Sequence, residues 1–468
     1  MDVSTSFWHG LGLELKCLTV FRSLLKDEVF QEFSHLTEIF SEEKACFENM
    51  SVSYHRFCGL LLEKACFSPF PRLGNAWQDY LLDRLLLEEN YFTRQAERSG
   101  AGEDLAPSLI KAARKDLMIL QRLFRVQTDQ IKNTIGVLTG VTGTEAEKIE
   151  GWPDWNETAL PGSFQEFSPA GRLKKSFRDA GAWEHLLKNL IDYYRQMGTG
   201  LFGCYQAFRF IQQGGQGRLT PVVEPDPIRL SHLIGYEYQR RQVVENTEQF
   251  LAGFPANNLL LYGERGTGKS STIKALVHEY GVAGLRLIEV AKQDLIFFPE
   301  LLGKLKGRAQ RFIIFIDDLS FEEGEFDYKY LKALLEGSLE ARPWNVLIYA
   351  TSNRRHLIKE SFRDREVIED GEVRTQDSLQ EKLSLADRFG ITIIFSTPDQ
   401  EEYLDIVEGL ARQRGLKIAP SLLREKALQW ERWHNSRSGR TARQFIDDLA
   451  GKILMGEGER RETNTVDL

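Results

Sequence analysis

The sequence of 468 residues lacks any uninterrupted apolar run that approaches the roughly 18 residues of a membrane-spanning helix. A secretory pattern is missing as well, because Glu14, Lys16, Arg22 and Lys26 interrupt the apolar stretches near the N-terminus. These absences argue against a transmembrane or secreted protein. We therefore expect a cytoplasmic protein with no membrane insertion.

Cysteine is scarce: the five cysteines are odd in number, and no two have CxxC spacing. This disfavours a disulfide framework or a cysteine-held metal, and predicts buried free thiols in a reducing compartment. A basic excess is also absent, since 68 acidic residues outnumber 60 basic ones and give a formal charge of −8. That balance argues against a broadly basic surface that coats nucleic acid, although it allows a local basic patch.

The length predicts two or three domains. In the first 212 residues, apolar side chains recur at helical spacing from Ile110 to Ile135, which predicts one face of a long helix. Residues 76–87 predict a second helix, and the small residues at 98–102 predict a break between the two. We therefore predict a mainly α-helical N-terminal domain over residues 1–212, for which the sequence indicates no role.

Glycine and proline over residues 213–229 predict a linker. After it, short apolar runs alternate with helical patterns, which predicts an α/β core over residues 230–398: a parallel five-stranded sheet with helices on both faces. Residues 399–455 are again helical in pattern, and the polar tail 456–468 predicts disorder. The predicted strands are Leu259–Tyr262, Leu285–Val290, Phe312–Ile316, Val346–Ala350 and Ile391–Phe395.

The most informative motif is the glycine-rich run GERGTGKS, which lies between a predicted strand and a predicted helix, as in a P-loop. Its backbone N–H groups can turn inward around phosphates, and the following helix adds its positive dipole. Lys269 can reach the β- and γ-phosphates, and the Ser270 hydroxyl can bind Mg²⁺. A plain glycine-rich turn is the alternative. The predicted nucleotide-binding residues are Gly263, Gly266, Thr267, Gly268, Lys269, Ser270 and Ser271.

Two carboxylates, Asp317 and Asp318, follow the apolar strand that ends at Ile316. A strand tip beside a P-loop is where an acid helps to hold Mg²⁺, and Asp317 fits that role. Asp318 would then orient or deprotonate the attacking water. The alternative is a buried strand with a capping aspartate after it.

Two further polar residues lie where an ATPase with a P-loop would need them. Asn353 closes a strand, and its amide could hold the water or the γ-phosphate; a turn residue is the alternative. Arg388 precedes the strand Ile391–Phe395, where it cannot easily reach its own nucleotide but could reach a neighbour's as an arginine finger. A surface arginine paired with Asp387 is the alternative.

The order of these motifs from about residue 230 to 451 resembles an AAA+ ATPase: Walker A, Walker B, sensor 1, arginine finger and a helical lid. Within that superfamily, the chain resembles a bacterial group catalogued as domain of unknown function 815. The stretches that carry this closer resemblance are residues 256–258, 317–324 and 350–357.

The resemblance implies a P-loop AAA+ core with residues 399–455 as its lid, bound ATP and Mg²⁺, and a homo-oligomer. It places Ile234 and Gly235 beside the adenine, and Arg443 on the γ-phosphate as sensor 2, with Arg440 as the other candidate. The choice of ATP over GTP depends on this resemblance.

The sequence departs from the usual AAA+ pattern in two places. Walker B ends in Asp-Asp where most members have Asp-Glu, which is compatible with slow hydrolysis and leaves Glu322 or Glu323 as an alternative base. The segment containing Phe297 and Phe298 lacks the aromatic–glycine pore loop of threading ATPases. We expect these two residues to belong to the core, and a threading unfoldase is disfavoured.

Two other regions leave alternatives open. The charged stretch from Glu360 to Glu381 predicts a solvated loop, with a partner-docking element as the alternative. Aromatic and basic residues in the predicted lid could bind nucleic acid, although packing within the lid is the more usual role. This cluster comprises Trp430, Arg432, Trp433, His434, Arg437 and Arg440.

Three functions follow. The leading hypothesis is an ATPase that assembles through Arg388 and remodels or loads a macromolecular partner: a protein or, with less support, a nucleic acid. The second is a nucleotide-switched binding module with little turnover, motivated by Asp318. The third is a small-molecule phosphotransferase, which would have no use for Asn353, Arg388 or Arg443. The sequence identifies neither the partner nor the ring size.

Overall fold

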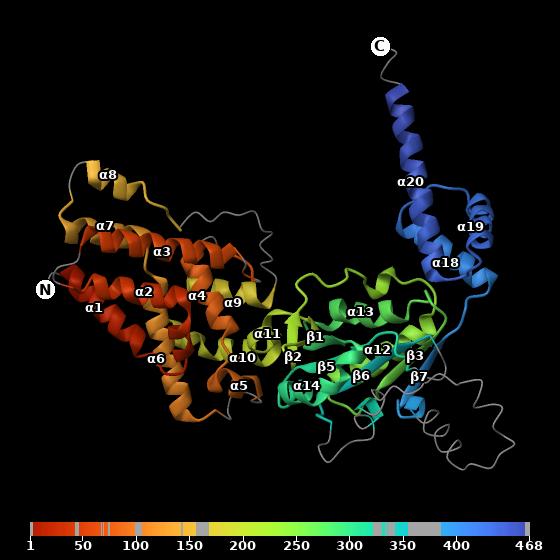
Figure 1. The fold of residues 1–468 in the computed structure, drawn as a ribbon, viewed down its shortest axis with the longest axis horizontal. Helices are drawn as coiled ribbons and strands as arrows, with labels where there is room; N and C mark the ends of the chain where they lie inside the picture. Colours follow the sequence, from red (N-terminus) through yellow and green to blue (C-terminus); the bar gives the residue numbers. More distant parts are fainter. Residues whose placement is uncertain are drawn as a thin grey trace. The chain divides into compact units, whose positions relative to one another are not determined.

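The computed structural model describes residues 3–42, 46–66, 68, 70–73, 75–98, 105–141, 144–155, 168–321, 330–332, 335, 342–353 and 385–463. The chain divides into two compact units, whose elements are labelled in Figure 1. One unit is Met1–Cys204 with Arg308–Gln310, and the other is Tyr205–Gly307 with Arg311–Leu468. The first boundary therefore falls before the predicted domain end at residue 212.

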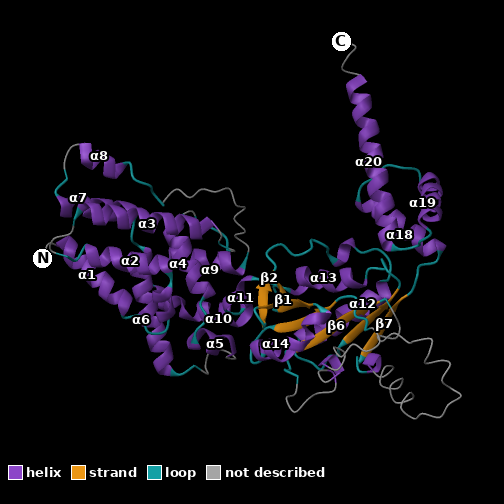
Figure 2. Ribbon diagram, viewed as in Figure 1, coloured by secondary structure: helices purple, strands orange, loops and turns teal. Residues whose placement is uncertain are grey.

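The N-terminal unit is helical in its described part (Figure 2). The helix predicted over residues 76–87 is confirmed as α4. The single long helix predicted around Ile110 and Ile135 is wrong, because Gln127 has an extended backbone and caps a new helix there. The helices are α1 (Val3–Lys16), α2 (Glu28–Ile39), α3 (Phe47–Cys66), α4 (Ala76–Leu87), α5 (Tyr91–Arg98), α6 (Pro107–Phe124), α7 (Thr128–Thr139), α8 (Thr144–Glu150), α9 (Pro169–Asp179), α10 (Leu187–Met197) and α11 (Gly200–Cys204).

Aromatic side chains fill the core of this unit. Trp77 stacks on Phe33 with ring centroids 4.9 Å apart, and both are buried. The buried ammonium of Lys174 pairs with Asp79 at 2.6 Å and with Asp83 at 2.8 Å. Paired burial of this kind offsets the cost of removing each charge from water.

The second unit is built on a mixed seven-stranded sheet in the order β2-β1-β4-β5-β6-β3-β7. Its strands are orange in Figure 2. All five predicted strands are present, and each pairs in parallel with its neighbours. The prediction of a five-stranded sheet is nevertheless wrong, since two more strands join it at one edge. The strands are β1 (Ala207–Gln213), β2 (Gln216–Pro221), β3 (Leu259–Gly263), β4 (Leu285–Val290), β5 (Arg311–Ile316), β6 (Val346–Ser352) and β7 (Ile391–Phe395).

The added strands come from residues 207–221, part of which was predicted to be a linker. Gln213 pairs with Gln216, so Gly214 and Gly215 form a two-residue turn of an antiparallel hairpin. Both glycines have positive φ angles, 61° and 79°, as the favoured two-residue hairpin turns require. The glycine pair that indicated flexibility therefore forms a tight turn.

Helices of the second unit pack against the sheet. The faces of β3 and β6 that carry Leu259, Leu261 and Tyr349 pack in one core with buried residues of α12 and α13. Leu260, one residue along, points to the other face and is fully buried too. The helices are α12 (Glu237–Leu251), α13 (Lys269–Tyr280), α14 (Phe298–Leu305), α18 (Gln400–Gln413), α19 (Pro420–His434) and α20 (Gly439–Thr463).

Helices α18 to α20 have a hydrophobic core of their own. Asp399 begins this segment with a capping box, in which its carboxylate accepts from the backbone N–H of Glu402 at 2.9 Å. Trp430 stacks on His434 with centroids 4.4 Å apart, whereas Trp433 is 71% exposed. Helix α20 continues to Thr463, which contradicts the predicted disorder of the tail as far as that residue.

Further expectations are tested by burial. Phe298 is buried, as expected of a core residue, and Phe297 is half-buried. The expectation of buried thiols holds for Cys58 but is wrong for Cys17 and Cys46, which are exposed. Within the described part of the chain, no helix combines the length and apolar character needed to cross a membrane.

Candidate nucleotide site

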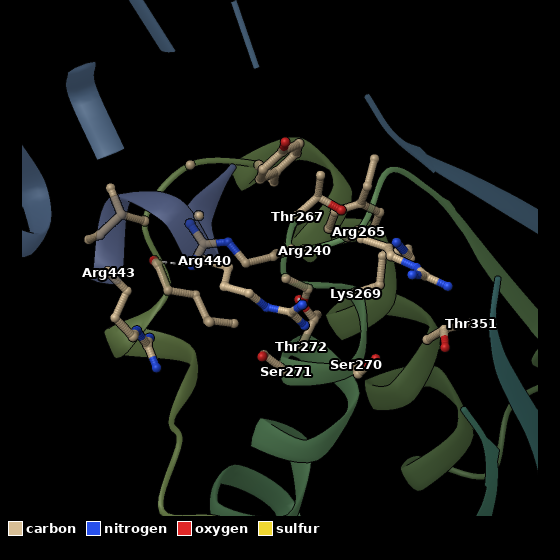
Figure 3. Close-up of a pocket in the computed structure, with 18 of the residues that line it drawn as sticks. Arg240, Arg265, Thr267, Lys269, Ser270, Ser271, Thr272, Thr351, Arg440 and Arg443 are labelled. Atoms are coloured by element: carbon tan, nitrogen blue, oxygen red, sulfur yellow. Dashed lines mark hydrogen bonds between the residues drawn. The ribbon is translucent and has the colours of Figure 1, made fainter. Parts of the chain in front are cut away.

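A cavity of about 570 Å³ lies at the carboxyl ends of the strands in the second unit (Figure 3). Parallel strands bring the residues after their carboxyl ends to one edge of a sheet, the usual ligand position in open α/β folds. Gly263 and Arg388 do not line this cavity, whereas every other site residue predicted from the sequence does. The lining includes Ile234, Gly235, Gly266, Thr267, Gly268, Lys269, Ser270, Ser271, Asp317, Asp318, Asn353, Arg440 and Arg443.

Gly263 shapes the P-loop from outside the cavity. It ends β3, pairs with Phe395 of β7 and has a φ angle of 148°. A Cβ atom at this position would lie 1.9 Å from the carbonyl oxygen of Phe395. No other residue type fits without moving a strand, so the glycine is a structural requirement of the loop.

We expect Gly263→Ala to lower the free energy of unfolding by about 3 kcal/mol or more, because backbone strain and a backbone clash add together. The measurement is the midpoint of thermal unfolding. Gly303→Ala in α14 is the control, since a Cβ there meets no atom within 4 Å and alanine favours a helix. Equal midpoints for Gly263→Ala and the wild type would show that the loop does not require glycine at this position.

Lys269 begins α13 and is 6% exposed. Its ammonium donates to the carbonyl oxygens of Gly263 and Glu264, each at 2.7 Å, and to Asn353 Oδ1 at 3.2 Å. Burial lowers the pKa of this amine, and the carboxylate of Asp317 partly opposes the shift. The cation is therefore held between the P-loop and the end of β6, at the position where phosphate oxygens would meet it.

The two aspartates after β5 have different partners. Asp317 Oδ1 accepts from the Ser270 hydroxyl at 2.6 Å, so the two predicted metal ligands are in contact. Asp318 has a φ angle of 50°, a left-handed conformation that aspartate tolerates better than most residues. Its Oδ1 atom accepts from Asn353 Nδ2 at 2.6 Å. The predicted base and the predicted sensor amide are thus directly joined.

The loop before α12 supplies the other end of the cavity. Ile234 and Gly235 line it, and Ile234 packs so closely on α18 that a Cβ on Gly409 would lie 2.6 Å from its Cγ2 atom. Tyr236 follows, with its ring 5.2 Å from that of Phe395 and its hydroxyl donating to Ser396 O at 2.6 Å. The side chains of Ile234, Tyr236 and Phe395 give this end an apolar lining that suits a planar base.

The C-terminal helical segment closes over the P-loop. The backbone N–H of Arg440 donates to Gly266 O at 3.1 Å, and a Cβ on Gly266 would touch the side chain of Ser438. Arg440 and Arg443 come from the first turn and a half of α20 (Figure 3). Both arginines line the cavity, and Arg440 lies against the P-loop, since a Cβ on Gly266 would lie 3.0 Å from the Cβ atom of Arg440.

Arg388 lies near the amino end of β7, whereas the cavity lies at the carboxyl ends of the strands. It precedes β7, whose residues pair in register with β3 from Leu259 to Gly263. At roughly 3.3 Å per residue, the five-residue strand separates Arg388 from the P-loop edge by about 16 Å. This separation agrees with the expectation that Arg388 does not serve the nucleotide site of its own chain.

The lining also includes residues that were not predicted from the sequence, among them Arg240, Arg265 and Thr351. Thr351 had a detectable signal, because it lies two residues before Asn353 and so faces the same side of the strand. Arg240 lies in α12 and had none. The alternative bases Glu322 and Glu323 and the charged stretch 360–381 lie outside the described residues.

The residues present fit a nucleoside triphosphate with Mg²⁺. The cavity volume lies within the usual range of small-molecule sites, about 300–1,000 Å³. The cations of Lys269, Arg440 and Arg443 line it, and cations of this kind suit phosphate oxygens. Ser270 and Asp317 supply the oxygen ligands that Mg²⁺ prefers.

Comparison with known proteins gives a family. A family described as "Protein of unknown function (DUF815)" matches residues 204–453. No curated protein matches the chain. Solved structures with some similarity include the Thermotoga maritima RuvB Holliday junction branch migration motor and its T158V and R170A forms. Each has 15% identity and a TM-score of 0.35, with 49% of this chain and 67% of that chain covered.

The family match covers more than half of the 468 residues, including the whole cavity lining. It confirms the resemblance seen in residues 256–258, 317–324 and 350–357. The chain belongs to the DUF815 family.

Proposed function

We propose that this chain is an AAA+ ATPase that hydrolyses ATP in a homo-oligomer, in which Arg388 of one subunit acts on the nucleotide of its neighbour. The observation that supports it is the convergence of Lys269, Ser270, Asp317, Asp318 and Asn353 on one cavity. A small-molecule phosphotransferase would need no arginine at the far edge of the sheet.

In this proposal each residue has one task. Lys269 and the P-loop amides bind the β- and γ-phosphates, and Ser270 and Asp317 hold Mg²⁺. The bound Mg²⁺ would neutralise phosphate charge. Asp318 accepts the proton of the attacking water, and Asn353 orients that water or the γ-phosphate. Ile234 and Gly235 lie beside the adenine.

We further propose that ATP turnover remodels or loads a macromolecular partner held by the N-terminal unit, in the cytoplasm. Support comes from a helical N-terminal unit whose sequence carries no catalytic motif. A protein partner is favoured over nucleic acid because the chain is acidic and Trp430 packs inside the C-terminal segment.

The test is steady-state ATP hydrolysis across a dilution series of the purified chain. A trans-acting arginine requires specific activity to rise with protein concentration, because the complete site forms only in the oligomer. Activity that is the same at every concentration, including concentrations at which the chain is monomeric, would contradict the proposal.

A second candidate is a nucleotide-switched binding module with little turnover. Asp318 favours it, since its side chain is one methylene shorter than the usual glutamate and is held by Asn353 at 2.6 Å. ATP binding would then shift an equilibrium between two states of the C-terminal segment. Turnover well above roughly one per minute, itself far below the usual range of kcat, would exclude this candidate.

We also propose Arg443 rather than Arg440 as sensor 2, on the resemblance of residues 439–445 to the sensor 2 motif. Arg443→Ala should then weaken ATP binding by roughly tenfold or more relative to ADP binding, since a charged hydrogen bond is worth about 1.5–3 kcal/mol. Nucleotide titrations with ATP and ADP measure this ratio for both arginine variants. A loss of ATP preference in Arg440→Ala alone would reverse the assignment.

A further inference from the structure

Thr351 lies between the two aspartates and the sensor amide without belonging to the predicted site. It is near the end of β6, where Ala350 pairs with Ile316 of β5, so that Thr351 stands opposite Asp317. Thr351 is 2% exposed but lines the cavity (Figure 3). A buried hydroxyl needs partners, and those of Thr351 are informative.

The hydroxyl of Thr351 contacts both aspartates. Its proton is donated to Asp317 Oδ1 at 2.6 Å, and its oxygen accepts from the backbone N–H of Asp318 at 3.0 Å. The carbonyl oxygen of Thr351 also accepts from the backbone N–H of Leu319 at 2.7 Å. One residue of β6 therefore fixes three consecutive residues after β5.

These contacts orient the carboxylate of Asp317, the predicted metal ligand. Asp317 Oδ1 receives two hydroxyl protons, one from Thr351 and one from Ser270, each at 2.6 Å. The backbone N–H of Asp318 donates to the same oxygen at 3.2 Å. Three donors on one oxygen fix the rotation of the carboxylate and leave Oδ2 available to a cation. Thr351 is outside the predicted ligand set, so its hydrogen bond serves to orient Asp317.

The same hydroxyl also stabilises the backbone conformation of Asp318, the predicted base. Asp318 has a φ angle of 50°, a left-handed conformation that is strained for a residue with a Cβ. Hydrogen bonds from the N–H groups of Asp318 and Leu319 to Thr351 hold the chain in this turn. In this conformation the Asp318 carboxylate accepts a hydrogen bond from Asn353.

We propose that Thr351 is a positioning residue, which sets the Mg²⁺-binding orientation of Asp317 and the backbone turn of Asp318. The inference depends on the proposed binding of Mg²⁺ and ATP. It predicts that the hydroxyl, and not the bulk of the side chain, controls how much Mg²⁺ the site requires.

The test compares Thr351→Val, which keeps the shape and removes the hydroxyl, with Thr351→Ser, which keeps the hydroxyl. ATP affinity of the full chain is measured across a Mg²⁺ titration, and hydrolysis is measured in parallel. The matched control is Thr247→Val, an equally buried threonine in α12 that does not line the cavity. Thr351→Ala replaces the valine variant if that variant does not fold.

We expect the valine variant to need about 10–100 times more Mg²⁺ for half-maximal ATP binding, the usual effect of removing a partner that orients a metal ligand. The serine variant and Thr247→Val should match the wild type. A valine variant with wild-type Mg²⁺ dependence would overturn the inference while leaving the proposed ATPase intact. A wild type that binds ATP without hydrolysing it would contradict the ATPase, but the binding titration would still decide the role of Thr351.

Discussion

Arg388→Ala is expected to reduce ATP hydrolysis about 10³-fold while leaving nucleotide binding unchanged. Arginine fingers stabilise charge that develops on the transferred phosphoryl group, and those supplied by a partner contribute about 10³–10⁵ in kcat. Binding should survive because Arg388 does not line the cavity and lies about one strand length from the P-loop. The expected change is therefore confined to kcat.

Two controls sharpen this result. Arg388→Lys keeps the charge but loses the planar guanidinium, so it should remain strongly impaired. Arg209→Ala removes an exposed arginine of β1, where the ion pair with Glu289 contributes little, and should retain activity. Hydrolysis and nucleotide affinity are measured for each. Wild-type turnover by Arg388→Ala would remove this residue from the catalytic account.

Lys269→Ala is expected to weaken ATP binding by roughly 30-fold or more, about 2 kcal/mol, and to abolish detectable hydrolysis. Lys269 is 6% exposed, so the attraction of its ammonium to phosphate is poorly screened by water. Its removal also takes away the donor to Gly263 O, Glu264 O and Asn353 Oδ1. The loss should therefore affect both the ligand and the loop that holds it.

Binding of a fluorescent ATP analogue, followed by competition with unlabelled ATP, measures this effect. Lys274→Ala is the matched control, since Lys274 lies in the same helix and does not line the cavity. We expect the control to bind ATP as the wild type does. If Lys269→Ala bound ATP with wild-type affinity, the cavity would not be a P-loop nucleotide site.

Much of the second unit could be predicted because its signals are local. Each predicted strand was a short, mainly apolar run, and β4 and β7 have the predicted ends. The P-loop, Asp317 and Asn353 were likewise recognisable from a few adjacent residues. Strand ends determine where such residues meet, so predicting the strands also predicted most of the cavity lining.

The errors arose where a tertiary contact decides the structure. Gly214 and Gly215 suit a flexible linker and a tight hairpin equally well, and pairing of β1 with β4 selects the hairpin. The break between α6 and α7 has no proline or glycine to mark it. The bond from Thr351 to Asp317 joins residues 34 positions apart and depends on the register of β5 and β6.

The most direct test of the central claim is to mix two inactive variants. Lys269→Ala subunits retain Arg388 but bind nucleotide poorly, whereas Arg388→Ala subunits retain an intact cavity but lack the arginine. If Arg388 acts on a neighbour's nucleotide, mixing the two at a concentration where the chain assembles restores part of the ATP hydrolysis. If the mixture stays as inactive as each variant alone, although mixed oligomers form, Arg388 does not act between subunits and the proposed mechanism is wrong.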